Sequence, residues 1–407
     1  MNKNFEQLGV ISGFISRLEE RNIKEATDIQ QKIIPRLAAG ESVFFASATG
    51  TGKTFAYLLP VLSKLTEPNG LGAAPCFLIA APTLELCTQI KNELDFLLSG
   101  TTIRSSLLIG SVNLDRQIEN LRKIRPDIIV GNPNRLLVLA KKRLIKFNNL
   151  RFFVLDEADR LVSDEMLDET SELCSIVCRN AQPVIAACSA TMNKKCMDKL
   201  FVALHIRGNK LNEIAFIESE DHEILRDKIE HWAIYTERRR KDQTLRSLLA
   251  ALRGKTSGKK KTRVKALVFT SRGDEASIVL SRLQFHHVSA AGLFGKSGKK
   301  PVSGQERKAA LDAFRNGSIE VLVSTDLAAR GLDIPGITHV IALDVPSDSE
   351  VYIHRCGRTA RAGKRGVMVT IGDETQMHLL ASMEKKLKIR VKPKELYEGK
   401  ICVPTME

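Results

Sequence analysis

A short glycine-containing loop constrains the fold of this chain more than any other feature of its sequence. The loop, Ser47–Thr54, follows the apolar run Val43–Ala46 and leads into an apolar, helix-like segment that starts at Phe55. A strand, a glycine turn and a helix start allow backbone N–H groups to surround a phosphate at the positive end of the helix. The pattern predicts a phosphate-binding loop, although Ser47 stands where the general pattern has a glycine. An ordinary turn is the alternative.

Individual residues of this loop have separate expected roles. Lys53 is expected to reach the β- and γ-phosphates of a nucleotide, and the Thr54 hydroxyl to hold Mg²⁺. The other expected phosphate contacts come from the loop itself: Thr49, Gly50, Thr51 and Gly52.

Short apolar runs alternate with helix-like segments along both halves of the chain. After the first loop these runs are Cys76–Ala81, Ser106–Ile109, Asp127–Val130, Phe152–Leu155, Val184–Ala187, Trp232–Tyr235, Ala266–Thr270, Val321–Ser324, His339–Leu343 and Val367–Ile371. Short buried strands separated by helices are typical of a mostly parallel sheet that is covered on both faces. We therefore predict an α/β fold, and 407 residues are enough for two domains.

The polar cluster Glu218–His222 and the weak apolar periodicity around it predict a linker at 209–226. This places an amino-terminal domain at 1–208, a carboxy-terminal domain at 227–395 and a short tail at 396–407. Two segments rich in Gly, Lys and Ser, 253–263 and 295–304, are expected to be mobile surface loops.

The positive charge of the chain lies almost entirely in its second half. Residues 1–221 carry 27 basic and 26 acidic side chains, whereas residues 222–407 carry 35 and 21, a net charge of +14. Such a surplus indicates a polyanionic partner, usually nucleic acid. A solvated basic face that improves solubility is the alternative.

The sequence predicts a cytoplasmic protein without a membrane segment. No apolar run approaches the ~20 residues of a membrane span, and the amino terminus lacks the apolar core of a secretory signal. The eight cysteines are scattered, and the closest pair, Cys174 and Cys178, has helical spacing. They indicate reduced core residues, with metal binding as the alternative.

An acidic segment, Asp156–Asp159, follows the apolar run Phe152–Leu155. A carboxylate at the carboxyl end of a buried strand is where a phosphate-loop enzyme places its Mg²⁺ partner. Asp156 is therefore expected to hold the metal through water, and Glu157 to orient and deprotonate the attacking water. An acidic cluster at a helix N-terminus would be the purely structural explanation.

The letters Asp156–Asp159, together with Ser189–Thr191, Ser324–Asp333 and Tyr352–Gly363, resemble the motifs of the DEAD-box family of RNA-dependent ATPases and helicases, in superfamily 2. The resemblance extends over 5–390. It implies two tandem RecA-like domains, each a mostly parallel sheet flanked by helices, with ATP and Mg²⁺ as cofactors. It also implies an ATP hydrolase that RNA stimulates.

The resemblance assigns roles at the ATP site to residues of both domains. Arg358 and Arg361 correspond to the arginines that reach the γ-phosphate and neutralise its charge. His354 corresponds to the residue that pairs with the acidic motif of the first domain. Asp333 corresponds to the residue that binds the ribose hydroxyl, and Gln30 to the glutamine that reads adenine.

The resemblance also covers the upstream aromatic position and the coupling motif. Phe5 stands at the upstream aromatic position of the nucleotide site, whereas Ile23 replaces the aromatic residue that stacks on adenine. This replacement implies lower affinity for the nucleotide or weaker selectivity for adenine. Ser189, Thr191 and Asp159 correspond to the residues that couple ATP to RNA.

The RNA-binding motifs match less completely than the ATP-binding motifs. The matching positions are Pro82, Thr83, Gly110, Pro133 and Arg135 in the first domain and Arg272, Gln305, Arg307 and Thr325 in the second. Four positions depart from the family pattern: Leu84, Ser111, Asn132 and Asn134. At position 84 the family has an arginine, so Leu84 removes a positive side chain. Because such motifs contact phosphate and sugar, they position RNA without reading its sequence. We infer that RNA binding has shifted toward the second domain.

Two further features have more than one explanation. Trp232 lies in a strand-like run, so core packing is favoured over base stacking. The segment Lys385–Lys392 alternates basic and apolar residues, which indicates either a basic surface on the last helix and strand or an accessory RNA contact.

Together these features predict an RNA-dependent ATPase that locally unwinds or remodels RNA duplexes or ribonucleoproteins when ATP closes the two domains. The expected partner is single-stranded RNA or a short duplex, without sequence specificity, and 2′-hydroxyl contacts would discriminate against DNA. We expect a monomer, with ribonucleoprotein or degradation-complex partners. The alternatives are an ATP-gated RNA clamp or assembly scaffold with little unwinding, and a DNA translocase of the same superfamily.

The departure at Leu84 gives a first testable prediction. Leu84→Arg places a positive side chain on the first domain, so RNA binding should tighten. The slope of log affinity against log salt concentration should also steepen, by about one released ion. Filter binding of single-stranded RNA over a salt series measures this slope. Unchanged slope and affinity would mean that position 84 does not face the RNA.

Overall fold

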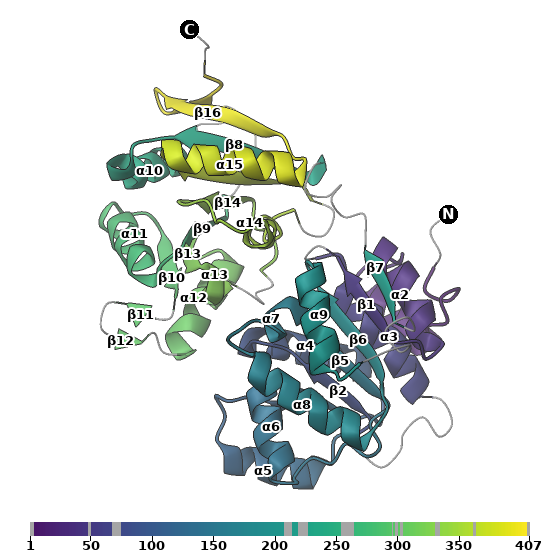
Figure 1. The fold of residues 1–407 in the computed structure, drawn as a ribbon. Coiled ribbons are helices and arrows are strands. Elements are labelled where there is room, and N and C mark those ends of the chain that lie inside the picture. Colours follow the sequence, from purple (N-terminus) through teal and green to yellow (C-terminus); the bar gives the residue numbers. More distant parts are fainter. Residues whose placement is uncertain are drawn as a thin grey trace. The chain divides into compact units, whose positions relative to one another are not determined.

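The computed structural model divides the chain into two compact units, residues 1–220 and 221–407. It describes residues 4–47, 50–66, 75–206, 214–218, 227–253, 264–294, 296–297, 300–301, 304–329, 334–360 and 364–404 (Figure 1).

Unit 1 contains a seven-stranded sheet whose described strand pairs are all parallel, in the order β3-β4-β2-β5-β6-β1-β7. Its strands are β1 (Val43–Ala46), β2 (Phe77–Ala80), β3 (Ser105–Leu108), β4 (Ile128–Gly131), β5 (Phe152–Asp156), β6 (Val184–Ser189) and β7 (Ala215–Glu218). Its helices are α1 (Ser12–Glu20), α2 (Asp28–Ala38), α3 (Lys53–Leu65), α4 (Leu84–Leu98), α5 (Leu114–Ile124), α6 (Pro133–Lys141), α7 (Ala158–Leu161), α8 (Leu167–Asn180) and α9 (Lys194–Ala203).

The helices cover both faces of this sheet, which is why its strands are continuously apolar. Successive side chains of a strand point to opposite faces. Accordingly, Val43 and Phe45 of β1 pack in one core with α1 to α4, whereas Phe44 and Ala46 pack in the other core with α6, α8 and α9. Both sides of β1 are therefore buried, as expected for a central parallel strand.

Unit 2 contains an eight-stranded sheet in the order β10-β13-β9-β14-β15-β8-β16-β17, in which only the β16–β17 pair is antiparallel among the described residues. Its strands are β8 (Ile229–Tyr235), β9 (Ala266–Thr270), β10 (Ala290–Leu293), β13 (Val321–Thr325), β14 (His339–Ala342), β15 (Gly366–Gly372), β16 (Val391–Tyr397) and β17 (Lys400–Cys402). Its helices are η3 (Arg238–Arg240), α10 (Lys241–Arg253), α11 (Gly273–Phe285), α12 (Gly304–Asn316), α13 (Asp326–Ala329), α14 (Ser349–Cys356) and α15 (Glu374–Leu387).

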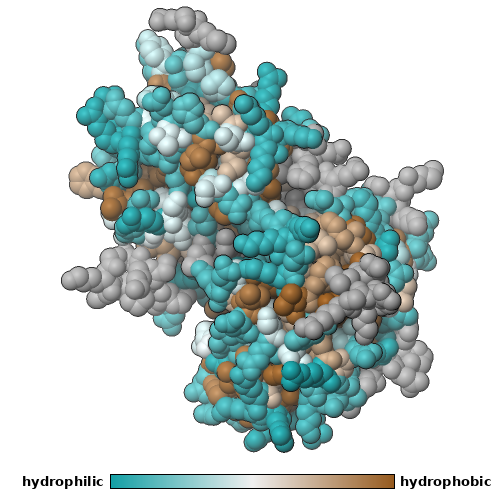
Figure 2. Space-filling view, viewed as in Figure 1, coloured by the Kyte–Doolittle hydropathy of each residue, from teal (hydrophilic) through white to brown (hydrophobic). Residues whose placement is uncertain are grey.

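Two cores lie on opposite faces of this second sheet. Helices α10 and α11 pack on one face, and α12, α14 and α15 pack on the other; Figure 1 shows α15 running along the sheet beside β8. The face of the molecule in Figure 2 is mostly hydrophilic, with apolar residues interspersed.

The predicted α/β class with mostly parallel sheets is confirmed, and every predicted strand is present. Strands at the sheet margins were not predicted. Strand β7 lies inside the range that we assigned to the linker, and β17 lies inside the predicted tail. Strand β7 overlaps a short apolar run, 214–217, that leads directly into the polar cluster Glu218–His222 on which we placed the linker; in the fold only alternate residues of β7 are partly covered.

The two predicted surface loops fall largely outside the described residues. The first is described only at Arg253, and the second contains a short antiparallel pair, β11 (Lys296–Ser297) and β12 (Lys300–Pro301). The domain boundaries at 208 and 227 remain predictions. None of the helices that the structure describes is long and apolar enough to cross a membrane.

His339, at the start of β14, gives a pH-dependent prediction for unit 2. Its ring lies 6.4 Å from that of Trp232, and burial lowers its pKa to about 4 from an ordinary value of 6.5. The unfolded chain therefore binds a proton at a higher pH than the folded chain does. As far as His339 determines it, the unfolding free energy of unit 2 is therefore highest above about pH 6.5 and decreases as the pH falls toward 4.

Between pH 7 and pH 5 we expect this imidazole to cost unit 2 about 2 kcal/mol of unfolding free energy. His339→Gln removes the titrating ring. The unfolding free energy of that variant, measured with urea, should therefore decrease by about 2 kcal/mol less between pH 7 and pH 5 than that of the original protein. Equal losses in the two proteins would contradict the lowered pKa.

Candidate nucleotide and nucleic-acid sites

The predicted phosphate loop lies between β1 and α3. Gly50 and Gly52 have φ angles of 86° and 90°, in the left-handed region that favours glycine. The hydroxyl oxygens of Ser47 and Thr51 are 2.5 Å apart, and both residues are buried, so this hydrogen bond closes the loop. Thr49 lies outside the described residues.

Gln30 connects helix α2 to the phosphate loop. Its side-chain oxygen accepts a hydrogen bond from the Thr27 N–H, and its Nε2 donates to the Gly52 carbonyl over 3.1 Å. A Cβ placed on Gly52 would lie 2.3 Å from that nitrogen. The contact explains why the loop needs glycine at this point. One lone pair and one N–H of the Gln30 amide remain for the predicted contact with adenine.

The predicted catalytic residues of unit 1 lie together at the carboxyl ends of the strands. Lys53 is the first residue of α3, and its Nζ donates to the Ser47 carbonyl over 2.6 Å. Burial lowers the pKa of Lys53, while the nearby Asp156 and Glu157 oppose that shift. The half-buried lysine thus lies near the predicted metal-binding and catalytic carboxylates.

Asp156 ends strand β5 and is only 4% exposed. Its Oδ2 accepts a hydrogen bond from the Tyr57 hydroxyl over 2.9 Å, and its Oδ1 accepts from the Glu157 N–H over 2.8 Å and from the Cys188 thiol over 3.2 Å. Burial raises the pKa values of Tyr57 and Cys188, so both groups keep their hydrogens and donate. Neither residue was predicted from the sequence to belong to the site.

Glu157 occupies an unusual backbone position directly after Asp156. Its φ of 49° is left-handed, and it forms the N-cap of α7 without a side-chain capping bond. A non-glycine residue in this region costs roughly 1–2 kcal/mol. Such local strain is common at functional sites, which agrees with the catalytic role predicted for Glu157.

These side chains fit a nucleotide with a divalent cation. The left-handed Gly50 and Gly52 shape the loop between β1 and α3, and Lys53 supplies positive charge. Thr54 and Asp156 supply the hydroxyl and carboxylate oxygens that Mg²⁺ prefers, and Thr54 also hydrogen-bonds Tyr57.

The coupling motif is joined directly to the phosphate loop. The Ser47 N–H donates to the Ser189 carbonyl over 3.1 Å, and the Thr191 N–H donates to the Ser189 hydroxyl over 3.3 Å. Asp159 accepts a hydrogen bond from the Arg160 N–H. Of the three predicted coupling residues, Ser189 therefore contacts the loop itself.

The predicted RNA-binding residues of unit 1 form a small hydrogen-bonded group. Arg135 donates to the Gly110 carbonyl and to the Gln117 side chain, each over 3.0 Å. The buried Gln117, which the sequence analysis did not consider, donates in turn to the Ile109 carbonyl over 2.9 Å.

The remaining RNA-binding positions of unit 1 lie at the starts of two helices. Thr83 caps α4 and accepts from the Leu86 N–H, and the buried Pro133 is the first residue of α6. Pro82 is buried, whereas the neighbouring Leu84 is 40% exposed.

In unit 2 two of the predicted RNA-binding residues meet at Ala328. Arg307 donates to the Ala328 carbonyl over 2.8 Å, and the Thr325 hydroxyl accepts from the Ala328 N–H over 3.4 Å. Arg272 is paired with Asp274 at an exposed position, and Gln305 is exposed near the start of α12.

A buried arginine that the sequence analysis missed organises this part of unit 2. Arg355 is 1% exposed, and it donates to both Asp326 oxygens over 2.6 and 2.7 Å and to Asp344 over 2.9 Å. Its guanidinium also lies 5.3 Å from the centre of the Phe269 ring. Because Asp326 follows β13 and Arg355 lies on α14, the ion pair ties the segment after Thr325 to α14.

Helix α14 also carries a predicted ATP-site residue, and a second one follows it. The Arg358 Nε donates to the His354 carbonyl over 3.1 Å, and Arg358 is 5% exposed within the described residues. Arg361 and Asp333 lie outside the described residues, so their predicted roles remain predictions.

Phe5 does not lie at an exposed position. It is 1% exposed in the core that contains α2 and α3. Its predicted contribution to nucleotide binding would therefore have to act through the packing of those helices.

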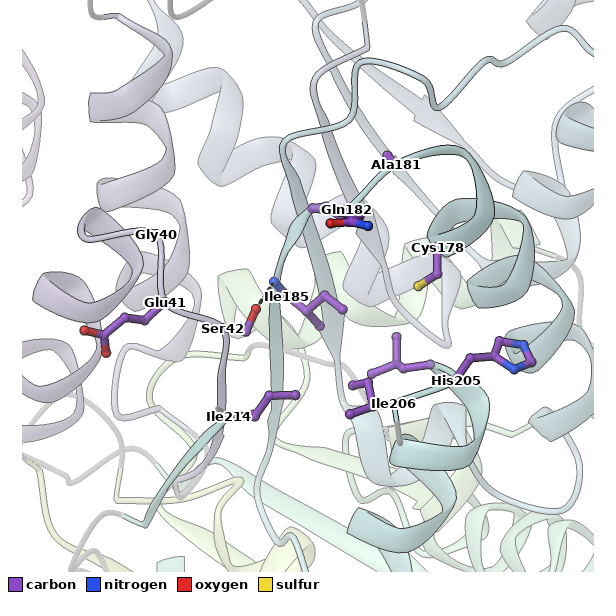
Figure 3. A pocket seen from close by; sticks show the side chains of 12 residues that line it. Gly40, Glu41, Ser42, Cys178, Ala181, Gln182, Ile185, His205, Ile206 and Ile214 are labelled. Atoms are coloured by element: carbon purple, nitrogen blue, oxygen red, sulfur yellow. Dashed lines mark hydrogen bonds between the residues drawn. The ribbon is translucent and has the colours of Figure 1, made fainter. Parts of the chain in front are cut away.

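A pocket of about 460 Å³ in unit 1 lies away from these residues (Figure 3). Its lining includes Ser42, just before β1, and Pro183, just before β6, with Ile206 after α9. In Figure 3 the Ser42 hydroxyl accepts a hydrogen bond from the Ile185 N–H, over 3.0 Å. The pocket thus lies at the amino-terminal ends of the strands, whereas the predicted catalytic residues follow their carboxyl ends.

The cysteines agree with the predicted reduced core. All eight are free, and six of them are buried. Within the described part of the chain no three His, Cys, Asp or Glu side chains are grouped as a metal site.

A phosphate loop and a strand-end aspartate in the first of two α/β units define a phosphate-loop ATPase. Comparison with known proteins identifies the family. Residues 27–199 match the DEAD/DEAH box helicase family, and residues 240–363 match the helicase conserved C-terminal domain.

Similar proteins cover nearly the whole chain. The DEAD-box ATP-dependent RNA helicase CshC of Bacillus cereus is 35% identical, with 94% of this chain and 90% of the relative covered. The probable ATP-dependent RNA helicase YfmL of Bacillus subtilis is 31% identical, with 93% of each chain covered. The structure of S. cerevisiae Dbp5 bound to RNA and ADP BeF3 has the same fold, with a TM-score of 0.82 and 24% identity over 97% of this chain and 96% of that one.

This chain therefore belongs to the DEAD-box helicase family, and it is an ATP-dependent RNA helicase with two RecA-like units.

The contact between Gly52 and Gln30 gives a prediction with an internal control. Gly52→Ala forces the Gln30 side chain to move and to lose its bonds to Thr27 and Gly52, in addition to the strain of a positive φ. We expect about 2–3 kcal/mol of lost stability in unit 1 and weaker binding of a fluorescent ADP analogue. Chemical denaturation and a binding titration measure the two effects.

Gly9→Ala is the matched control, because Gly9 has a φ of 82° but no atom within 4 Å of an added Cβ. It should cost about 1 kcal/mol through backbone strain alone and leave nucleotide binding unchanged. Equal effects of the two substitutions would rule out a special role for the contact between Gly52 and Gln30.

Proposed function

We propose that this helicase separates short RNA duplexes locally when ATP draws its two units together around one RNA strand. The observation that carries the proposal is the hydrogen bond between Ser47 and Ser189. It joins the phosphate loop to the predicted coupling motif, beside the half-buried Lys53 and the buried Asp156. A change at the nucleotide can thus pass directly to the segment that follows β6.

Hydrolysis would use the residues at the carboxyl ends of β1, β5 and β6. The loop N–H groups and Lys53 would bind the β- and γ-phosphates. Mg²⁺, when bound by Thr54 and through water by Asp156, would neutralise charge that develops on the phosphoryl oxygens. Glu157 would accept a proton from the attacking water as its oxygen bonds to the γ-phosphorus and the bond to ADP breaks.

Unit 2 would complete this site when the units close. Arg358 and Arg361 would neutralise γ-phosphate charge, His354 would pair with the acidic motif, and Asp333 would bind the ribose. Arg355 supports this proposal, since it fixes α14 against Asp326 and so positions His354.

RNA would bind through its backbone, at Gly110 and Arg135 in unit 1 and at Arg272, Arg307 and Thr325 in unit 2. The net charge of +14 in residues 222–407 favours unit 2 as the stronger electrostatic contact. A bent strand is incompatible with a regular duplex, so one strand would be released. We further propose that the protein acts as a monomer in the cytoplasm, on RNA or ribonucleoproteins.

A second candidate function is an ATP-gated RNA clamp with little unwinding. Two observations favour it. Leu84 presents an apolar side chain, 40% exposed, where the family has an arginine. The guanidinium of Arg135 already donates to Gly110 and Gln117, so fewer of its N–H groups remain for RNA.

The proposal predicts ATP hydrolysis that depends on RNA. Single-stranded RNA should raise the steady-state rate about tenfold or more, a barrier reduction of roughly 1.4 kcal/mol, and DNA of the same sequence should not. Asp156→Asn and Glu157→Gln serve as inactive references, since each removes a group placed in the hydrolytic site.

Duplex release then separates the two candidate functions. Release of a short RNA duplex with ATP, but not without nucleotide, would support the helicase. Stable RNA binding with ATP or a nonhydrolysable analogue, without release of either strand, would support the clamp. Equal stimulation by RNA and DNA would overturn both.

A further inference from the structure

We propose that Tyr57 and Cys188 are positioning residues that set the Mg²⁺ affinity of the nucleotide site by holding the Asp156 carboxylate from two sides. This inference rests on the proposed role of Asp156 at the Mg²⁺ site. Neither side chain is expected to touch the nucleotide or the metal ion. Cys188 would act through Asp156, and Tyr57 through Asp156 and its hydrogen bond with Thr54.

Within the described residues, the hydrogen bonds leave the Asp156 carboxylate a single open acceptor position. A carboxylate offers about four lone-pair sites. On Asp156, Oδ1 accepts from the Glu157 N–H and from the Cys188 thiol, and Oδ2 accepts from the Tyr57 hydroxyl. The remaining site is therefore the second lone pair of Oδ2. A metal-bound water would have to approach along that one direction.

The two side chains come from the two elements that border the nucleotide site. Tyr57 lies one turn after Lys53 on α3, the helix that follows the phosphate loop. Cys188 lies on β6, immediately before Ser189, and the sheet register places it beside Asp156. The orientation of Asp156 is thus set jointly by the phosphate-loop helix and by the strand that leads into the coupling motif.

Both donor side chains are at least as deeply buried as the Asp156 carboxylate. Tyr57 and Cys188 have no exposed surface, so water cannot replace their hydrogen bonds when one is removed. Tyr57 also receives a hydrogen bond from Thr54, the other residue predicted to hold Mg²⁺. The phenol hydroxyl therefore connects the two predicted metal-binding side chains.

The experiment measures the binding of a fluorescent ADP analogue to the full chain over a Mg²⁺ series and in EDTA. Tyr57→Phe keeps the ring but frees Oδ2, so the Mg²⁺ concentration for half-maximal binding should rise about fivefold, as expected for one lost hydrogen bond. Affinity in EDTA should stay within about twofold, because the phosphate contacts are intact.

Cys188 gives a graded series at the other oxygen. A thiol is a weak donor, so Cys188→Ala should raise the Mg²⁺ requirement by only about twofold. Cys188→Ser restores a hydrogen-bond donor and should return the Mg²⁺ requirement to that of the original protein. If Cys188 acted through packing alone, serine would not bind better than alanine at this position, because serine is the more polar of the two in an apolar core.

Two matched controls separate positioning from general loss of packing. Tyr352→Phe removes the hydroxyl of a tyrosine that is 1% exposed and bonded to His231, far along the chain in unit 2. Cys174→Ala shortens a fully buried cysteine in the other core of unit 1. Neither should change the Mg²⁺ requirement, even where thermal unfolding shows a loss of stability.

Asp156→Asn distinguishes failure of this inference from failure of the proposed metal role. If Asp156→Asn leaves the Mg²⁺ requirement unchanged, Asp156 does not hold the metal and the proposal fails with it. If Asp156→Asn raises the requirement while Tyr57→Phe matches Tyr352→Phe, the metal role stands and the positioning role is overturned. A rise for Tyr57→Phe, with serine at position 188 better than alanine, supports the proposal.

Discussion

The candidate nucleotide site depends on the parallel register of the sheet in unit 1. Parallel strands end at the same edge, so residues that follow them meet however far apart they lie in the sequence. The register pairs Asp156 with Cys188 and Ala46 with Ser189, which brings the acidic motif and the coupling motif to the phosphate loop. The pocket in Figure 3 lies at the opposite ends of the strands, and none of these motifs reaches it.

Both units hold buried charge at this kind of edge, and both compensate it with hydrogen bonds. In unit 1 the Asp156 carboxylate accepts three donors. In unit 2 the Arg355 guanidinium donates to Asp326 and Asp344. A buried ion is costly unless its partners are well placed. These networks therefore hold strand ends and helix starts in defined positions, which a site that binds a charged substrate requires.

The sequence was sufficient to predict the parts that follow strict local patterns. Continuous apolar runs identified the central strands, and the glycines with Lys53 identified the loop. The sequence could not show what depends on packing between distant segments. Strand β7 escaped notice because its short apolar run leads directly into the polar cluster Glu218–His222. Tyr57, Cys188 and Arg355 read as ordinary helix, core and surface residues until the fold brought each of them to a carboxylate.

The distribution of cysteines has a practical consequence for observing the molecule in solution. Only Cys178 and Cys402 are more than marginally accessible among the eight, and they lie in different units. The unaltered chain thus offers one reachable thiol on each unit, and the six buried cysteines are shielded from a labelling reagent. A pair of dyes attached at these two positions would report the distance between the units directly, without a cysteine being added or removed.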